Sequence, residues 1–148
     1  MRALLTLAAE GEGGGQGKAL TAERLASAQE LPVKFLENIL VDLRRAGLVR
    51  SQRGSEGGYR LARPASEITA ADVLRIVDGP LAEVRGGRPE QSSYEGPAEH
   101  LRDVWVAARA ALRSVLEHVT LADIAAGTLP PAIAKMAADP DAWSVRTR

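Results

Sequence analysis

Residues 48–63, LVRSQRGSEGGYRLAR, constrain the fold of this chain more than any other stretch. Apolar residues begin at Leu48 and resume at Tyr59, and three glycines lie between them: Gly54, Gly57 and Gly58. Glycine reaches positive φ and lets another backbone approach closely, so the pattern predicts a β-hairpin with a tip poor in side chains. Four arginines flank that tip: Arg50, Arg53, Arg60 and Arg63. Such a tip suits a phosphate backbone or a minor groove, although a solvated hairpin could carry the same charges.

Two helices joined by a short turn are predicted ahead of the hairpin. Thr21 can cap the first helix, and Pro32 suits the first turn of the second, where a missing N–H costs nothing. The second helix is expected to run to about Ala46 and to stop at Gly47. Its apolar positions share an arc of roughly 140°, a core-facing stripe, made of Phe35, Leu36, Ile39, Leu40 and Leu43. The opposite face carries Lys34, Asn38, Val41 and Arg45.

The chain has no net charge, with 19 Lys and Arg against 19 Asp and Glu, but the charge is unevenly distributed. Residues 18–63 hold nine basic and five acidic residues, whereas residues 64–148 hold nine and twelve. The positive charge therefore lies in the two helices and the hairpin, where contact with phosphate would need it. Helix, turn, amphipathic helix and basic hairpin follow the order of a winged helix-turn-helix, whose second helix enters the major groove of DNA.

A long helix is predicted after the hairpin. Thr69 and Asp72 form a capping box for a helix that ends at Gly79, and residues 82–97 are polar enough to form a mobile loop. The long helix is expected over about residues 98–119, with one apolar stripe within about 120°, made of Leu101, Val104, Trp105, Ala108, Leu112, Val115, Leu116 and Val119. This stripe could pack on its own domain or pair with a second copy by near-heptad spacing.

Two blocks of the sequence resemble the Rrf-type (BadM-like) winged-helix transcription regulators. The first block has its specific core in FLE, LR, AGLV, RG, GGYRLARP and IT, and the second is WVAARAALRSVLEHVTLAD. The resemblance covers roughly residues 3–126. That family includes the iron–sulfur cluster regulator, the nitrite-sensitive repressor and the cysteine-metabolism repressor. The chain begins later than members usually do, so we expect a shorter first helix.

The resemblance implies roles for particular residues. Lys34, Glu37 and Asn38 stand where relatives read bases, and Arg53 stands at the wing-tip position that resembles the family's minor-groove contact. The full set of expected DNA-binding residues is Thr21, Val33, Lys34, Glu37, Asn38, Arg45, Arg53, Gly57, Gly58, Tyr59 and Arg60. The resemblance also favours pairing of the long helix, so its stripe is the expected dimerisation surface.

The predicted fold is mainly α with a small β-wing, a winged helix-turn-helix domain followed by a long C-terminal dimerisation helix. We divide the chain into a DNA-binding domain (1–80), a polar loop (81–97), the dimerisation helix with a short final helix (98–126), and a loosely ordered tail (127–148). The glycine-rich stretch 11–20 departs from the pattern of a phosphate-binding loop, so it is expected to be a flexible connector.

The chain contains no cysteine, which separates it from the redox-sensing members of the family. Those members resemble one another in three cysteines before the long helix, where this chain has residues 81–103. Since iron–sulfur clusters are held mainly by thiolates, we expect no cluster, no other cofactor and no metal site. His100 and His118 are about 27 Å apart along the predicted helix, too far to share a metal within one chain. Metal ligation across a dimer, by His100 with Glu95 or Glu99, is the alternative.

The expected function is that of a homodimeric, sequence-specific DNA-binding regulator of transcription. We expect a repressor that acts in the cytoplasm on a near-palindromic operator in double-stranded DNA. The alternative is a protein-interaction module with only residual DNA binding. No pattern of catalytic residues is found, so an enzyme is not expected. The signal is open: a small molecule in a cleft between the winged domain and the long helix, a partner protein, or none. Any regulation is expected to act through residues 81–105.

Overall fold

The computed structural model describes residues 1–11, 18–84 and 86–145. Its helices and strands are α1 (Arg2–Glu10), α2 (Ala22–Gln29), α3 (Val33–Arg45), β1 (Val49–Gln52), β2 (Gly58–Leu61), α4 (Ala70–Val77), α5 (Leu101–Leu116), α6 (Leu121–Ala126) and α7 (Pro131–Ala137). Short 3-10 turns cover Ala65–Glu67, Pro89–Gln91, Gly96–Ala98 and Pro140–Trp143. The predicted class is confirmed: the chain is mainly helical with one two-stranded antiparallel sheet. Most of the expected connector, residues 12–17, lies outside the described residues.

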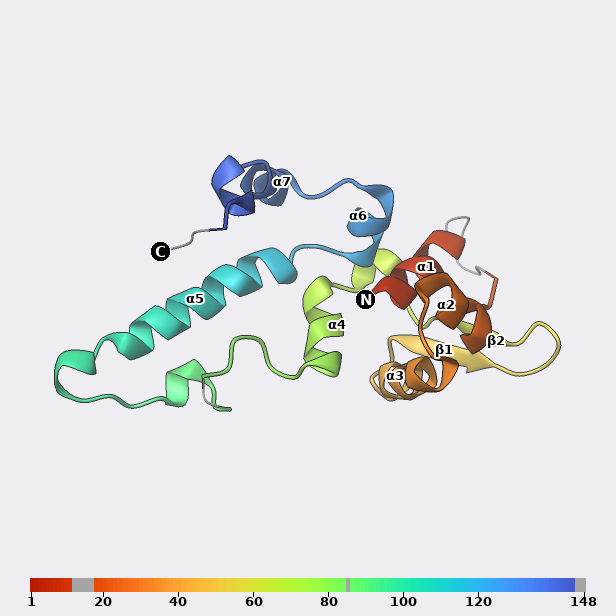
Figure 1. The fold of residues 1–148 in the computed structure, drawn as a ribbon, viewed down its shortest axis with the longest axis horizontal. Helices are drawn as coiled ribbons and strands as arrows, with labels where there is room; N and C mark the ends of the chain where they lie inside the picture. The colour runs from red at the N-terminus through yellow and green to blue at the C-terminus, as the bar shows by residue number, and fades with distance from the viewer. Residues whose placement is uncertain (12–17, 85, 146–148) are drawn as a thin grey trace.

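The molecule is elongated, with the winged domain at one end and the far end of α5 at the other (Figure 1). α1, α2, α3 and the hairpin pack together, and α4 stands beside them. The segment after α4 leads outward, and α5 brings the chain back to the winged domain. Within the described part of the chain, no helix has the length and apolar character needed to cross a membrane.

The predicted start of α2 and end of α3 are confirmed. The hydroxyl of Thr21 accepts a hydrogen bond from the backbone N–H of Arg24 at 3.3 Å, so Thr21 is the N-cap of α2. After α3, Gly47 has a φ of 73°, and the backbone N–H of Leu48 donates to the carbonyl of Leu43 at 2.9 Å. This bond satisfies a carbonyl that the helix leaves unpaired, and the left-handed Gly47 turns the chain into β1.

The predicted hairpin is confirmed, with β1 and β2 antiparallel in a register that opposes Val49 to Leu61. β2 is also paired on its other side, where Leu20 and Tyr59 exchange backbone hydrogen bonds of 3.0 and 2.8 Å. Gly58 lies at this junction with a φ of 144°, and a Cβ there would lie 2.5 Å from the carbonyl oxygen of Leu20. Because glycine has no Cβ, it allows this approach and fixes the hairpin to the segment that enters α2.

The core lies within the winged domain and draws on residues from both ends of the chain. Its largest fully buried side chains include Leu4, Leu25, Leu36, Leu40, Leu43, Leu48, Ile68 and Leu121. In α3 the buried stripe is narrower than predicted, because Ile39 is only partly buried and Phe35 is 55% exposed. Phe35 lies at the end of the predicted arc, where the helix surface already turns to solvent. Its assignment to the core is therefore wrong.

Two backbone hydrogen bonds return the chain from α5 to the winged domain. The N–H of Ala70 donates to the carbonyl of Val119 at 2.8 Å, and the N–H of Leu121 donates to the carbonyl of Ile68 at 2.9 Å. These bonds join the start of α4 to the start of α6. As a result α6 packs on α1, and Leu121 is fully buried. The short final helix, which we grouped with the long helix, is thus part of the core of the winged domain.

Outside the winged domain the chain is more regular than predicted. Residues 82–97 contain a 3-10 turn at Pro89–Gln91, which packs on α5 with Pro89 fully buried. α5 is shorter at both ends than the predicted helix. The expected tail contains α7, with Pro131 in its first turn, and the 3-10 turn Pro140–Trp143. Proline suits the first turn of a helix, where the N–H has no partner, so these prolines begin elements instead of marking a loop.

Leu121 tests whether α6 belongs to the core. Leu121→Ala should lower the free energy of unfolding by about 2–5 kcal/mol, because truncating a fully buried leucine leaves a cavity. Leu129→Ala, at a position 38% exposed, is the control and should lower it by much less. Chemical denaturation followed by circular dichroism measures both variants. Equally small losses would show that α6 is not part of the cooperative core.

Candidate nucleic-acid interface

α3 presents one face to solvent because its leucines bury the other. The side chains of Lys34 and Arg45 are 87% and 77% exposed, and Asn38 between them is exposed as well. Val33, the first residue of the helix, is 36% exposed. These predicted residues therefore lie on the accessible part of one helix, where polar side chains can reach base edges or phosphates.

Both basic side chains on this face have an acidic neighbour one turn away. The Nζ of Lys34 lies 3.4 Å from the Oε2 of Glu37, and the Nη1 of Arg45 lies 3.6 Å from the Oδ1 of Asp42. Exposed ion pairs of this kind contribute little to stability, so they can exchange one partner for another. The face thus offers cationic donors and carboxylate acceptors within one turn of each other.

The wing tip combines an exposed arginine with tight backbone packing. Arg53 follows β1 and is exposed. At Gly57 a Cβ would lie 2.6 Å from the carbonyl oxygen of Gly54, so no side chain fits there. Behind the tip, Arg60 donates to the side-chain oxygen of Gln52 on the facing strand. Arg53 is therefore accessible to a ligand, while Arg60 links the two strands.

Arg63, expected to flank the tip, contacts a different part of the molecule. Its guanidinium donates to the backbone carbonyl of Glu67 at 2.6 Å and to the carboxylate of Asp72 at 3.1 Å. Asp72 also accepts from the backbone N–H of Thr69 in the predicted capping box, which is present. Arg63 therefore stabilises the start of α4, and its placement beside the wing tip is wrong.

Thr21 and Tyr59 position elements of the domain as well as belonging to the predicted interface. Tyr59 packs against the core and pairs through its backbone with Leu20. The pKa of Glu23 is lowered, first by a hydrogen bond from its own backbone N–H and then by one from the Thr21 hydroxyl. Glu23 therefore keeps its negative charge at the N-terminal end of α2, where the helix dipole favours it. A phosphate that contacts Thr21 would compete with this carboxylate.

The structure places two further residues on or beside the candidate interface, Phe35 and Arg44. Phe35 is exposed on α3, next to Lys34 in the chain. The Nη1 of Arg44 donates to the hydroxyl of Ser51 on β1 at 3.4 Å, which links the end of α3 to the wing. The position of Phe35 at the margin of its arc is a sequence signal for exposure, whereas the contact of Arg44 with Ser51 depends on the turn between helix and strand.

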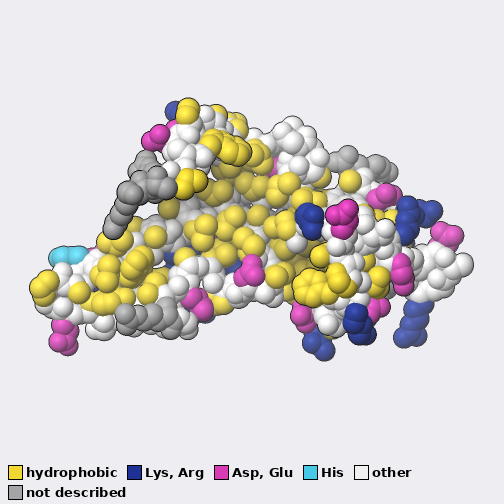
Figure 2. Space-filling view, in the orientation of Figure 1, with side chains coloured by type: hydrophobic (Ala, Val, Ile, Leu, Met, Phe, Trp, Pro, Cys, Tyr) yellow, Lys and Arg dark blue, Asp and Glu magenta, His cyan; other side chains and the backbone are white. Residues whose placement is uncertain are grey.

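α5 carries an apolar face that its own chain leaves uncovered. None of its described residues is buried, and Leu101, Val104 and Leu112 are 36%, 56% and 40% exposed. Figure 2 shows hydrophobic side chains spread over the part of the molecule that holds α5 and α7, while Lys and Arg gather at the wing end. Val119 is only 6% exposed and is bonded to the start of α4. Its assignment to the dimerisation surface is therefore wrong.

The other residues of the apolar stripe differ in their exposure to solvent. Ala108 is exposed, and Trp105, Val115 and Leu116 are half-buried. The indole Nε1 of Trp105 is itself buried and has no hydrogen-bond partner among the described residues. Buried N–H groups in folded proteins are nearly always paired. The Trp105 N–H is one of the exceptions in the described part of the chain.

The segment before α5 offers few ligands to a metal ion. Glu90 forms an ion pair with Arg109 of α5, and the Nδ1 of His100 lies 3.3 Å from the Oδ2 of Asp103. His100 and His118 flank opposite ends of α5, and both are exposed. Over residues 1–11, 18–84 and 86–145, no three His, Cys, Asp or Glu side chains are grouped so that they could hold a metal.

Sequence comparison finds relatives that match most of the chain. The model of the Rrf2 family, described as an iron-dependent transcriptional regulator, matches residues 1–127. Rv1287 of Mycobacterium tuberculosis is 54% identical over 123 residues, which are 83% of this chain and 76% of that protein. The HTH-type transcriptional regulator CymR of Bacillus subtilis is 38% identical over 104 residues, which are 70% of each chain.

Solved structures share the fold. The structure of CymR (YrzC), the global cysteine regulator of B. subtilis, matches with a TM-score of 0.66 and 34% identity, and the match covers 85% of this chain and 92% of that one. IscR of T. potens matches with a TM-score of 0.61 and 27% identity, over 99% of this chain and 86% of that one. The shared fold therefore extends over most of this chain in both structures.

Iron, which the description of the family names, does not fit the donors of this chain. The sequence has no cysteine, so the thiolates that hold iron–sulfur clusters are missing. In the segment before α5, the pKa of Glu90 is lowered by a hydrogen bond from its own backbone N–H and by another from Arg109. That carboxylate is therefore already bound to a cation of its own chain.

Fold, exposed side chains and relatives lead to one conclusion. A winged helix-turn-helix with an accessible second helix and a cationic wing is an arrangement that reads DNA. The family match extends over residues 1–127, and the CymR relative carries the name of an HTH-type transcriptional regulator. The chain belongs to the Rrf2 family of helix-turn-helix regulators, and it is a DNA-binding regulator of transcription.

Proposed function

We propose that two copies of this chain bind a near-palindromic site in double-stranded DNA and repress transcription there, in the cytoplasm. In each copy α3 enters the major groove, and the wing tip lies against the adjacent minor groove. The observation that carries this proposal is the exposed polar face of α3 opposite its buried leucines. Repression needs no further activity, because a protein bound at a promoter blocks access to it.

The first turns of α3 supply the groups that read bases. Lys34 can donate to the acceptors of guanine, Glu37 can accept from the amino group of cytosine, and Asn38 can pair with adenine. Phe35, which the core does not use, adds an apolar surface suited to the methyl group of thymine. Val33 lies beside them at the exposed start of the helix. This mixture of donors, acceptors and apolar surface supports sequence-specific reading.

The wing and the ends of the helices orient the domain on the duplex. A narrow minor groove concentrates negative potential, which attracts the exposed guanidinium of Arg53. Gly57 and Gly58 let the backbone of the wing approach closely, because neither carries a side chain. Thr21 and Arg45 are suited to phosphates, which position a protein on DNA without reading its sequence.

The uncovered face of α5 supports a dimer. Leu101, Val104 and Leu112 would be buried if α5 packed against α5 of a second copy, which would remove apolar surface from water. A two-fold dimer presents two α3 helices to half-sites about 34–36 Å apart, so the site should be near-palindromic.

Selection of bound fragments from genomic DNA tests the proposal directly. The recovered sequences should share a near-palindrome, and the protein should bind that duplex about a thousandfold more tightly than random duplex at the same salt concentration. Affinity should fall steeply as salt rises, because neutralised phosphates release counterions. Equal affinity for selected and random duplexes would instead support a protein-interaction module with residual DNA binding.

Substitutions at Lys34 and Arg53 should weaken DNA binding in different ways. Lys34→Ala should cost about 1–3 kcal/mol of binding to the selected duplex and relax the preference at one base pair, because it removes a base contact. Arg53→Ala should weaken binding without lowering the melting temperature, because its side chain is exposed on the wing. Fluorescence anisotropy with single-base variants of the duplex measures both. Equal losses on every duplex for Lys34→Ala would make Lys34 a phosphate contact, and a lower melting temperature for Arg53→Ala would make Arg53 structural.

Leu112 tests the dimer surface. Leu112→Glu would place a carboxylate in an apolar interface at a cost of several kcal/mol, so we expect monomers and loss of operator binding. Ser114→Glu adds the same charge two residues away, at an exposed position on the opposite side of α5, and should leave the dimer intact. Sedimentation velocity and circular dichroism give the mass and the folded state of each variant. A dimeric Leu112→Glu protein would show that this face packs elsewhere.

A further inference from the structure

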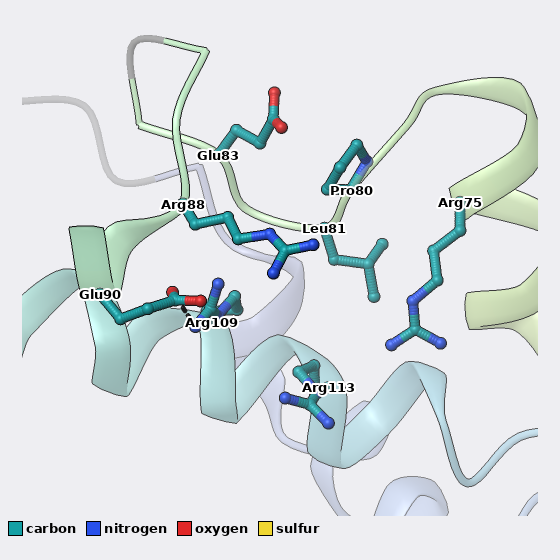
Figure 3. Close-up of a pocket in the computed structure, with 8 residues that line it drawn as sticks. All are labelled: Arg75, Pro80, Leu81, Glu83, Arg88, Glu90, Arg109 and Arg113. Carbon is teal, nitrogen blue, oxygen red and sulfur yellow. Dashed lines mark ion pairs between the residues drawn. The ribbon is translucent and has the colours of Figure 1, made fainter. Parts of the chain in front are cut away.

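A cavity of about 400 Å³ lies between α4, the segment that follows it, and α5. Its volume falls within the range of small-molecule sites, about 300–1,000 Å³. Figure 3 shows side chains from three parts of the chain converging on it. Arg75 comes from α4, Arg88 from the segment after α4, and Arg109 and Arg113 from α5. Neither the DNA interface nor the dimer surface uses this cavity.

Three of the four guanidinium groups are bound to carboxylates of the chain. Arg109 pairs with Glu90 at the edge of the cavity. Arg75 and Arg113 both donate to the Oε1 of Glu117, so one carboxylate bridges α4 and α5. Hydrogen bonds from Arg75 and then from Arg113 lower the pKa of Glu117, which therefore stays charged at neutral pH.

Arg88 is different, because its side chain makes no hydrogen bond or ion pair with any described residue, although its charge helps to lower the pKa of Glu90. Its guanidinium nevertheless points toward the middle of the cavity, between Leu81 and Arg109 in Figure 3. The carboxylate of Glu83, which also lines the cavity, stands apart from the guanidinium groups in that view. The centre of the cavity is therefore cationic, with an open position beside Arg88.

The residues that line the cavity also indicate which chemical groups a ligand would have. Pro80 and Leu81 form an apolar wall beside the arginines. Arginine binds carboxylates and phosphates through two parallel N–H donors, which makes it the preferred residue for planar or tetrahedral oxyanions. A ligand that fits these groups has at least one such oxyanion and a short apolar or neutral part.

We propose that this cavity binds a small anionic metabolite, with one or more carboxylate or phosphate groups held by Arg88, Arg109 and Arg113. The ligand acts on the long helix in place of the iron–sulfur cluster that this chain lacks the cysteines to bind. This regulatory role rests on the proposed function in DNA binding. It does not need a cysteine or a metal ion.

The position of the cavity gives the ligand a way to act on DNA binding. α4 belongs to the winged domain and α5 to the dimer surface, and the bonds at Ala70 and Leu121 hold their near ends together. Beside this junction, the ion pair between Arg75 and Glu117 links α4 to the end of α5 through side chains. An anion that takes Arg113 from Glu117 changes the angle between α4 and α5. In a dimer this angle sets the distance between the two α3 helices, and therefore the affinity for the operator.

Binding is tested first without DNA. Full-length protein is titrated with inorganic phosphate, succinate and citrate by calorimetry, and melting temperatures are measured, with potassium chloride used to keep the ionic strength constant. At least one probe should bind stoichiometrically and raise the melting temperature. Arg88→Gln should raise the Kd of that probe about tenfold or more, a loss of about 1.4 kcal/mol.

Arg102→Gln is the matched control, because Arg102 is on α5 but does not line the cavity. It should bind the probe as the wild-type protein does. Since the Arg88 side chain makes no hydrogen bond or ion pair with a described residue, Arg88→Gln should keep the wild-type melting temperature when no probe is present. Failure of all three probes to bind, or equal binding by Arg88→Gln and the wild type, would overturn the proposed site.

A second measurement tests the regulatory role. The Kd for the selected duplex should change by about fivefold or more at saturating probe, and the duplex should change the Kd of the probe by the same factor. An unchanged Kd would overturn regulation through this cavity. A protein that binds the probe but no specific duplex would contradict the proposed function while the calorimetry still supports the anion site.

Discussion

Two backbone hydrogen bonds, between Ala70 and Val119 and between Leu121 and Ile68, determine how the halves of this protein meet. Each bond lies beside a threonine that caps a helix, Thr69 for α4 and Thr120 for α6. Because both helices start at this junction, their directions are set together. α6 is thereby directed into the core against α1, and α5 is left to project with its apolar face uncovered. The proposed dimer surface and the cavity between α4 and α5 both follow from this junction.

Elements specified by local chemistry could be predicted from the sequence. The cap at Thr21, the left-handed turn at Gly47 and the hairpin of β1 and β2 each depend on residues close to one another in the sequence. The docking of α6 on α1 could not be predicted, since Leu121 reaches the core only after the chain has left it and returned. The same return buries Val119, which continues the stripe of α5 in sequence but not in space.

The site residues are harder to predict, because a charged side chain can bind either a ligand or another part of its own chain. The exposure of Lys34, Asn38 and Arg45 follows from the helical period, because the leucines define the buried direction. Arg63 carries the same charge as Arg53 and lies ten residues away, yet it binds Asp72 of α4. No spacing rule separates these two arginines, because the difference arises from where α4 begins. The roles of the individual residues on DNA stay predictions.

The ion pairs on α3 have a consequence for how the protein searches DNA. In the free protein, Glu37 and Asp42 already occupy the cations that the proposed complex would use. A phosphate that binds Lys34 or Arg45 would compete with these carboxylates, and it would repel the carboxylate of Glu37. A base pair with an amino group in the major groove accommodates the carboxylate and releases Lys34 at the same time. In the proposed complex these carboxylates would act as intramolecular competitors of phosphate, so part of the selectivity would be a property of the unbound protein.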